Sequence, residues 1–393
     1  MLIRYKQNEV GKRIKKALVY THAEHTIDSK KIDIEALHIL SNLQHAGYEA
    51  YIVGGAVRDL LIGKTPKDFD IVTAAEPARI RKIFKNSRII GKRFRLVHVF
   101  FGKKIYEVST FRSITQGTTG NIFGTIEEDV LRRDFTFNAL YYDPIKDIVI
   151  DYVGGIRDIR NKRLSAIIGL STIFIEDPVR MLRAIKYATI THASIPFLLC
   201  CRIHYDAFLL EYISASRLTE EINKILMSGF AHDTFKLLLQ YNLFLYLQPS
   251  AFAFLEDYPD FYASYFQSMH ELDILTAAGK IQRQGDALVY LIRDFLHLIT
   301  DWKEQPRVVY KSVYNDCRHF VLPMNPQRAE LEYAVKYCLR KGGLDMRLLR
   351  PNKVKEGQAS SYGLQKTAHQ GSCKPFKRKR PQSSSSVQSK LDA

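Results

Sequence analysis

Two adjacent glycines, Gly54 and Gly55, most constrain how this chain can fold, because they end an apolar run at residues 49–53. The run predicts a buried strand, and the glycines predict a tight turn into a short helix that carries Arg58. Glycine lets backbone N–H groups approach a bound group closely, and a helix N-terminus attracts anions. The turn is therefore a candidate phosphate-binding element. It is not a P-loop, because no Gly-Lys-Ser/Thr follows at the required distance.

A second pattern, Asp68-Phe69-Asp70, predicts two carboxylates on one face of a strand. Such a pair repels itself in an apolar setting unless a cation lies between the two groups. Oxygen ligands with no Cys or His nearby indicate magnesium, and two ions held this way can activate a hydroxyl and stabilise a departing pyrophosphate. An isolated Asp-x-Asp is more often a solvated strand edge. The glycine turn upstream makes Asp68 and Asp70 candidate catalytic residues.

A third acidic ligand is usually needed for this chemistry, and two residues can supply it. Glu107 follows Tyr106 in a run that predicts a strand of a hairpin, and Asp134 follows two arginines, Arg132 and Arg133. The residue pattern leaves both choices open.

The segment that begins at Asp177 predicts a helix that can read a nucleotide base. Asp177 suits a helix cap, and Arg180, Arg183 and Lys186 follow at intervals of three, so that neighbours adjoin on the helix surface. An arginine fork and a carboxylate at one helix end can hydrogen-bond a base edge and select a nucleotide without a template. The alternative, a basic surface with an ordinary cap, is equally compatible with the pattern.

Charge indicates a polyanionic partner. The 393 residues carry 58 Lys and Arg against 41 Asp and Glu, a net charge of +17, which favours nucleic acid or an anionic membrane surface over a neutral partner. The five cysteines form no C-x-x-C pair and suit a reducing compartment. The chain shows no signal peptide and no apolar run long enough for a bilayer, so we expect a cytoplasmic protein without a membrane partner.

The hydrophobic periodicity changes along the chain and predicts an α+β organisation. Short strands and helices alternate up to about residue 160, whereas apolar residues recur at three and four from Asp177 onward. We expect five regions: a loose basic arm (1–30), a mixed-sheet head (31–160), a nucleotide-recognition neck (161–225), a helical RNA-binding body (226–350) and a disordered basic tail (351–393).

Taken together, these motifs resemble those of the bacterial class II RNA nucleotidyltransferases, a family that contains poly(A) polymerases and tRNA CCA-adding enzymes. The matching segments, in the order of the family, are Gly54-Gly55-Ala56-Val57-Arg58-Asp59, Asp68-Phe69-Asp70, Arg132-Arg133-Asp134-Phe135-Thr136, Asp151-Tyr152-Val153-Gly154-Gly155-Ile156-Arg157-Asp158 and Glu176-Asp177-Pro178-Val179-Arg180-Met181-Leu182-Arg183-Ala184.

The resemblance implies a polymerase-beta-like head and a role for each matching residue. Asp68 and Asp70 would bind the two catalytic magnesium ions, and Asp134 would be the third catalytic acid in preference to Glu107. The nucleotide-binding residues that it implies are Gly54, Gly55, Arg58 and Arg133 for the triphosphate, and Asp177, Arg180, Arg183 and Lys186 for the base. Lys186 departs from the arginine that many members carry, and lysine lacks the bidentate fork.

Three features favour the poly(A) branch: residues 89–99, residues 121–129 and the basic tail. The expected reaction is template-independent addition of AMP from ATP to RNA 3′ ends, in mRNA polyadenylation and RNA turnover, with the RNA-degradation machinery as a possible partner. CCA addition to tRNA is the first alternative. An inactive RNA-binding adaptor is the second, although the metal carboxylates and the Arg132-Arg133-Asp134 motif are intact.

Overall fold

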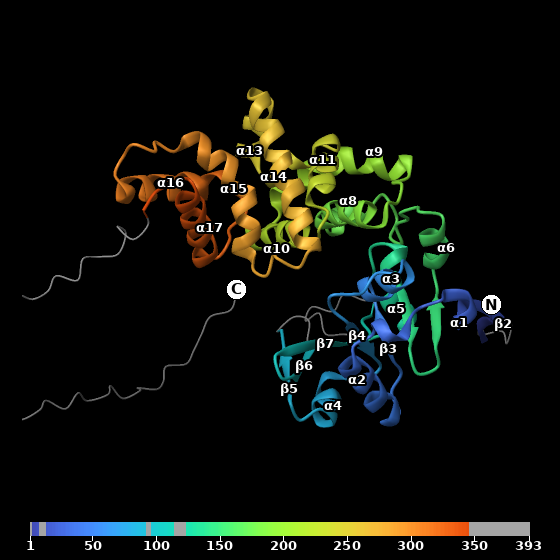
Figure 1. Cartoon of the computed structure of the whole chain (residues 1–393). Coiled ribbons are helices and arrows are strands. Elements are labelled where there is room, and N and C mark those ends of the chain that lie inside the picture. Colours follow the sequence, from blue (N-terminus) through green and yellow to red (C-terminus); the bar gives the residue numbers. More distant parts are fainter. Residues whose placement is uncertain (1, 8–12, 92–95, 114–122, 346–393) are drawn as a thin grey trace, which may run out of the picture. The chain divides into compact units, whose positions relative to one another are not determined.

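One mixed β-sheet organises the first part of the chain (Figure 1). The computed structural model describes residues 2–7, 13–91, 96–113 and 123–345. The sheet order is β1-β2-β9-β8-β3-β4-β7-β6-β5, and every neighbouring pair is antiparallel except the parallel pair β4 and β7. The strands are β1 (Leu2–Gln7), β2 (Arg13–Thr21), β3 (Ala50–Val53), β4 (Asp70–Thr73), β5 (Ser87–Ile90), β6 (Leu96–Phe101), β7 (Lys104–Thr110), β8 (Leu140–Asp143) and β9 (Ile148–Asp151).

Helices cover both faces of this sheet, because its central strands are buried on both sides. One core packs α2, α3 and α4 against Ile52, Ile71 and Val108, and the other packs α5 against Val72 and Tyr141. The helical elements of this region are α1 (His22–His25), η1 (Ser29–Lys31), α2 (Ile34–His45), α3 (Gly55–Leu61), α4 (Pro77–Ile83), α5 (Ile126–Leu131), η2 (Thr136–Asn138) and α6 (Gly155–Arg160).

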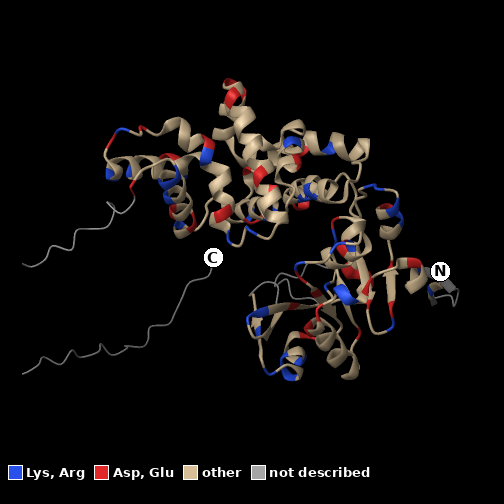
Figure 2. Ribbon diagram, viewed as in Figure 1, with Lys and Arg blue, Asp and Glu red and all other residues tan. Residues whose placement is uncertain are grey.

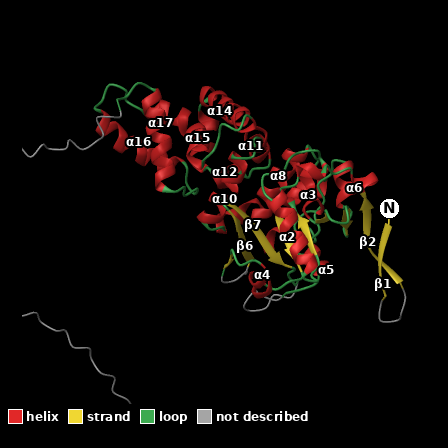
Figure 3. Cartoon of the chain, turned by 60° about the horizontal axis from the view of Figure 1, so that its bottom comes forward, coloured by secondary structure: helices red, strands yellow, loops and turns green. Residues whose placement is uncertain are grey.

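The expectation that residues 1–30 form a loose arm is wrong. β2 pairs with β9 along residues 18–21, and β1 pairs with β2, so this segment extends one edge of the sheet (Figure 3). Ala17 and Tyr20 are buried against the sheet. The many Lys and Arg residues between the apolar positions make the strand pattern hard to recognise in the sequence. The strand is stabilised by its pairing with β9.

The remainder of the described chain is helical from α7 onward, as the periodicity predicts. A single apolar core includes Met181, Leu182 and Ile185 of α8 and continues to Leu344. The elements are α7 (Ile173–Glu176), α8 (Val179–Thr191), α9 (Phe197–Asp206), η3 (Ala207–Tyr212), α10 (Ala215–Leu226), α11 (Ala231–Gln240), α12 (Phe244–Leu247), α13 (Pro249–Asp257), α14 (Pro259–Ala277), α15 (Gln284–Ile299), α16 (Pro306–Phe320) and α17 (Arg328–Lys341).

The sheet region and the helical region belong to one compact unit, so the expected divisions after residues 160 and 225 stay predictions. Lys, Arg, Asp and Glu are interspersed over both regions (Figure 2). Among the described residues, no helix combines the length and apolar composition that crossing a bilayer requires. The expected basic tail lies outside the described residues, as do parts of the segments 89–99 and 121–129.

Candidate active site

The glycine turn between β3 and α3 has the predicted form. Gly54 adopts φ +74° and ψ −132°, a backbone conformation that residues with a Cβ rarely reach, and α3 begins at Gly55. A Cβ on Gly54 would lie 3.8 Å from Nη1 of Arg133, which is ordinary contact. Backbone conformation, rather than space, therefore requires glycine at this position.

The two aspartates lie beside this turn. Asp70 is the first residue of β4 and pairs with Val53, the last residue of β3 before the glycines. Asp68 lies in the loop just before β4 rather than on the strand, and both side chains are exposed. The sheet thus brings the predicted metal-binding pair next to the predicted phosphate-binding turn.

Glu107 is the acid that the sheet places beside Asp70. In the parallel pair β4–β7, Ile71 is the partner of Val108, so Asp70 and Glu107 are one residue earlier at the same level. Because Ile71 and Val108 both pack into one core, their two acidic neighbours point toward the opposite face. Glu107 is exposed and lies 3.4 Å from Nε2 of His98.

Both reduced hydration and neighbouring charges act on Asp70. The pKa of Asp70 lies above its ordinary value, first because the surrounding protein reduces the hydration of the charged carboxylate. Glu107 and Asp68 add like charge and raise the pKa further, whereas Arg133 and Lys224 lower it. Among the residues that the structure describes, neither Asp68 nor Asp70 forms an ion pair. A carboxylate set of this kind suits a hard divalent cation.

Asp134 has a different setting. Its buried carboxylate accepts hydrogen bonds from Nε of Arg183 at 2.6 Å, Nδ2 of Asn138 at 3.2 Å and the N–H of Phe135 at 2.8 Å. Burial alone would raise the pKa of Asp134, but Arg183 and these hydrogen bonds hold it below its ordinary value. The structure therefore brings Asp134 to an arginine, and Glu107 to Asp70.

Asn138 joins the predicted triphosphate-binding arginines. Nη1 of Arg58 donates to Oδ1 of Asn138 at 3.1 Å, and Nη1 of Arg133 donates to the carbonyl of Asn138 at 3.1 Å. Since Asn138 also donates to Asp134, it links the glycine turn to the Arg132-Arg133-Asp134 motif. The sequence pattern did not single out Asn138, although it closes that motif.

At the start of α8, the predicted base-reading residues are held by separate partners. Both oxygens of Asp177 accept hydrogen bonds from Nη2 of Arg217, at 2.9 and 2.8 Å. Nη1 of Arg180 donates to Glu176 at 2.9 Å and to the carbonyl of Ile173 at 3.0 Å. Arg217 is a residue that the sequence analysis missed, because its contact with Asp177 spans two helices.

Lys186 is the least accessible of the four predicted base-binding residues. It is 6% exposed, and its Nζ lies 2.9 Å from Oε2 of Glu221, which is 5% exposed. Lys186 thus forms a buried ion pair between α8 and α10.

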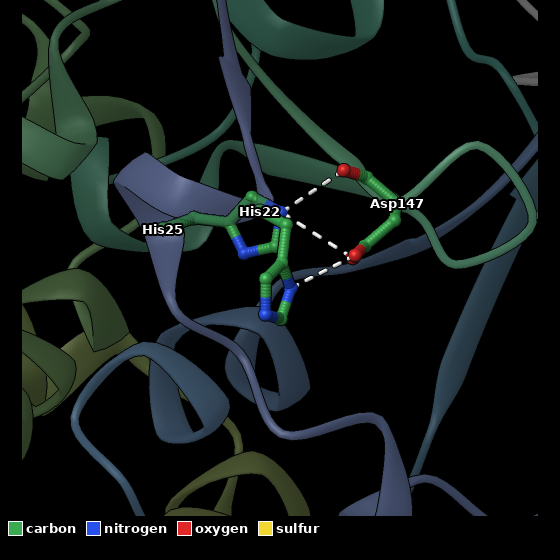
Figure 4. A group of neighbouring side chains, drawn as sticks. All are labelled: His22, His25 and Asp147. Atoms are coloured by element: carbon green, nitrogen blue, oxygen red, sulfur yellow. Dashed lines mark hydrogen bonds and ion pairs between the residues drawn. The ribbon is translucent and has the colours of Figure 1, made fainter.

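A separate cluster, His22, His25 and Asp147, holds its ligand atoms within 4.8 Å of one another (Figure 4). Nδ1 of His25 accepts the N–H of Ile27 at 3.1 Å, so Nε2 carries the proton of the neutral ring and faces the carbonyl of Asp147 at 3.1 Å. A metal-bound histidine instead donates from its second nitrogen. The cluster therefore fits a hydrogen-bonded connection between α1 and the β8–β9 turn better than a metal site.

Two family models match the chain. The poly A polymerase head domain matches residues 50–165, and a probable RNA and SrmB-binding site of polymerase A matches residues 202–255. Over residues 50–165 the chain is similar to the poly A polymerase head domain.

Curated proteins of known name are also similar to this chain. Poly(A) polymerase I of Escherichia coli O6:H1 is 44% identical over 248 residues, which are 59% of this chain and 53% of that protein. The corresponding protein of Salmonella typhimurium is 45% identical over 243 residues, 58% and 52% of the two chains. A CCA-adding enzyme of Geobacillus kaustophilus is 35% identical over 221 residues, 54% of each chain. The chain thus spans about half the length of these curated relatives.

Solved structures share the fold. A tRNA nucleotidyltransferase complexed with a primer tRNA and an incoming ATP analog has a TM-score of 0.53 at 22% identity, covering 80% of this chain and 87% of that one. A CCA-adding enzyme without ligand has a TM-score of 0.51 at 20% identity, covering 87% and 92%. The mixed-sheet head followed by helices is therefore the fold of these solved structures.

Proposed function

We propose that this protein is a template-independent polynucleotide adenylyltransferase that adds AMP from ATP to RNA 3′ ends. The observation that carries the proposal is the position of three carboxylates, Asp68, Asp70 and Glu107, beside the Gly54–Gly55 turn. The choice of ATP and of unstructured RNA rests on the likeness to proteins named poly(A) polymerase I. A cytoplasmic role in mRNA polyadenylation and RNA turnover, with the RNA-degradation machinery as a partner, belongs to the same proposal.

The donor set fits magnesium, since it offers carboxylate oxygens without sulfur or nitrogen ligands. Asp68, Asp70 and Glu107 would hold two ions, which when bound activate the RNA 3′-hydroxyl and neutralise the departing pyrophosphate. The three carboxylates themselves fix where the hydroxyl and the α-phosphate meet, so catalysis is mainly positioning and needs no covalent enzyme intermediate.

The remaining predicted residues would bind the nucleotide. Backbone N–H groups at Gly54 and Gly55 and the guanidinium groups of Arg58 and Arg133 suit a triphosphate. Asp177 and Arg180 suit a base edge, once their contacts with Arg217 and Glu176 rearrange. Arg183 would join the nucleotide-binding set.

For the third acid we propose Glu107, and for Asp134 a supporting role through Arg183. Glu107 lies at the level of Asp70 in the parallel pair, whereas the oxygens of Asp134 are already occupied by Arg183, Asn138 and Phe135. This assignment reverses the preference that the family resemblance implies.

The test is incubation of the purified chain with magnesium, ATP or CTP, and two RNAs: a tRNA that lacks its CCA end and an unstructured RNA. We expect long A tracts on both RNAs. The addition of a finite CCA end to the tRNA alone would establish the CCA-adding alternative, which the likeness to the Geobacillus kaustophilus enzyme keeps in view.

Two variants complete this test. Asp70→Asn should abolish incorporation, and Glu256→Gln, an exposed acid on α13, should leave it unchanged. RNA binding without any incorporation by the unsubstituted chain would instead support the adaptor alternative.

A further inference from the structure

Three cations of the candidate site gather around one aromatic ring. Tyr187 is a half-buried residue of α8. Cζ of Arg58 lies 5.0 Å from the centre of its ring, Cζ of Arg183 lies 5.4 Å away, and Nζ of Lys186 lies 5.1 Å away. Phe135 meets the same ring edge-on at 6.2 Å between centroids and 79° between planes. These distances lie within the range of attractive cation–π contacts.

The ring of Tyr187 completes a closed circuit of contacts between α3 and α8. Arg58 donates to Asn138, Asn138 donates to Asp134, and Asp134 accepts from Arg183. Tyr187 then contacts both Arg183 and Arg58. The two arginines would repel each other, and the circuit holds both guanidinium groups against one neutral, electron-rich ring.

This arrangement leaves donors available. Arginine has five N–H donors, and the hydrogen bonds of Arg183 in the described part of the chain use Nε alone. Arg58 uses Nε, Nη1 and Nη2 once each, toward Asp59 and Asn138, so each of its Nη groups keeps one N–H. An aromatic ring restricts the orientation of a guanidinium group without occupying an N–H donor. A second carboxylate would instead occupy donors by accepting hydrogen bonds from them. The free donors suit a polyanion such as a triphosphate.

We propose that Tyr187 is a positioning residue for nucleotide binding, whose ring holds Arg58 and Arg183 side by side so that their remaining N–H groups bind the triphosphate of the incoming nucleotide. This inference rests on the proposed function, because it takes a nucleoside triphosphate as the ligand. Tyr187 itself need not contact the nucleotide. The hydroxyl of Tyr187 has no part in the contacts described above, so phenylalanine should replace tyrosine.

The experiment compares Tyr187→Phe, Tyr187→Leu and Tyr187→Met in the full chain, with Tyr337→Leu as the matched control. Tyr337 lies on α17 with Arg340 at 5.6 Å and Lys341 at 5.9 Å from its ring, so it has comparable cation contacts outside the site. We measure kcat and KM for ATP in primer extension, ATP binding by calorimetry and thermal unfolding. The loss of the cation–π contacts with Arg58 and Arg183 should raise KM and Kd for ATP about tenfold in the Leu and Met variants.

The expected pattern is an increase in KM with kcat changed less than about threefold in Tyr187→Leu, rescue in Tyr187→Phe, and no change in Tyr337→Leu. An unchanged Kd for ATP in both the Leu and the Met variant would overturn the inference. Equal damage from Tyr187→Phe would also overturn it. If the unsubstituted chain extends no RNA, the proposed function fails, while ATP binding still decides the role of Tyr187.

Discussion

The acidic residues near the glycine turn and the acidic residue Asp134 lie in opposite electrostatic environments of the same sheet region. Asp68, Asp70 and Glu107 lie beside the glycine turn, and no arginine or lysine of the described residues is in ion-pair contact with either aspartate. Reduced hydration, together with like charge, raises the pKa of Asp70. Asp134 is buried and its pKa is lowered, because Arg183 neutralises it. The comparison teaches that an acidic residue in a catalytic motif is best assigned from the charges around it. The first set needs a cation, whereas Asp134 already has one.

The largest effect should come from Asp70→Asn. Removing one charged oxygen ligand from the first set should lower kcat about 1,000-fold. The metal ions that this carboxylate would hold stabilise the charge that develops during phosphoryl transfer. Primer extension at saturating ATP measures the effect, with circular dichroism as the check on folding. Activity within tenfold of the unsubstituted chain would contradict the assignment of Asp70 to the metal site.

Lys186→Met extends the comparison to a second neutralised acid. It would leave the buried carboxylate of Glu221 with only its longer contact to Lys224 at 3.3 Å, and should lower the free energy of unfolding by about 3 kcal/mol. Urea denaturation measures this loss. Lys186→Arg, which keeps the charge, should be much less damaging, and equal losses in both variants would show that packing rather than pairing matters.

Glu107→Gln distinguishes the two candidates for the third acid. We expect kcat to fall about 100-fold with little change in stability, since Glu107 is exposed and should act on the metal site alone. Primer extension over a range of magnesium concentrations should show a higher requirement for the ion. An active Glu107→Gln variant beside an inactive but stable Asp134→Asn variant would restore Asp134 as the third acid.

Asp134→Asn should act mainly through Arg183. Weakening this pair should lower the free energy of unfolding by about 2 kcal/mol, less than for a fully buried pair because Arg183 is partly exposed. The KM for ATP should rise as Arg183 loses its anchor, with a smaller change in kcat. Thermal unfolding and steady-state kinetics on the same preparation separate the two effects.

The smallest effect concerns pH and stability in the absence of metal. The pKa of Asp70 is raised in the folded protein, so its charge destabilises the fold, and this cost appears as the pH rises through the raised pKa. In EDTA, Asp70→Asn should therefore be more stable than the unsubstituted chain near neutral pH, by less than about 1 kcal/mol because solvent screens an exposed group. The difference should vanish as the pH falls toward the ordinary aspartate range. A difference that is independent of pH would contradict this account.

Local patterns predicted the parts of the site that one segment builds. The turn at Gly54, the strand that carries Asp70 and the β6–β7 hairpin depend on residues close in sequence, although this strand begins at Asp70 and leaves Asp68 in the loop, contrary to the prediction. The neighbour of Asp70 depends instead on the parallel pairing of β4 with β7, which no local pattern specifies.

The same reason explains what the sequence did not reveal in the helical region. The partners of Asp177 and Lys186 lie on α10, and the cations around Tyr187 come from α3 and α8. The same limit applies to β1 and β2, because β2 pairs with the distant strand β9 and β1 pairs with β2. Periodicity, in contrast, predicted the helical region well, because each helix carries its own apolar stripe.

The pairing of β2 with β9 also bears on how the protein is made. Residues 18–21 leave the ribosome long before residues 148–151, yet the two segments pair in the folded sheet. Until β9 is synthesised, one edge of β2 presents unpaired N–H and C=O groups, a surface to which other strands can add. The pairing of this edge of the sheet is thus completed late in synthesis. Nascent chains that stall before residue 148 should be the species most prone to self-association.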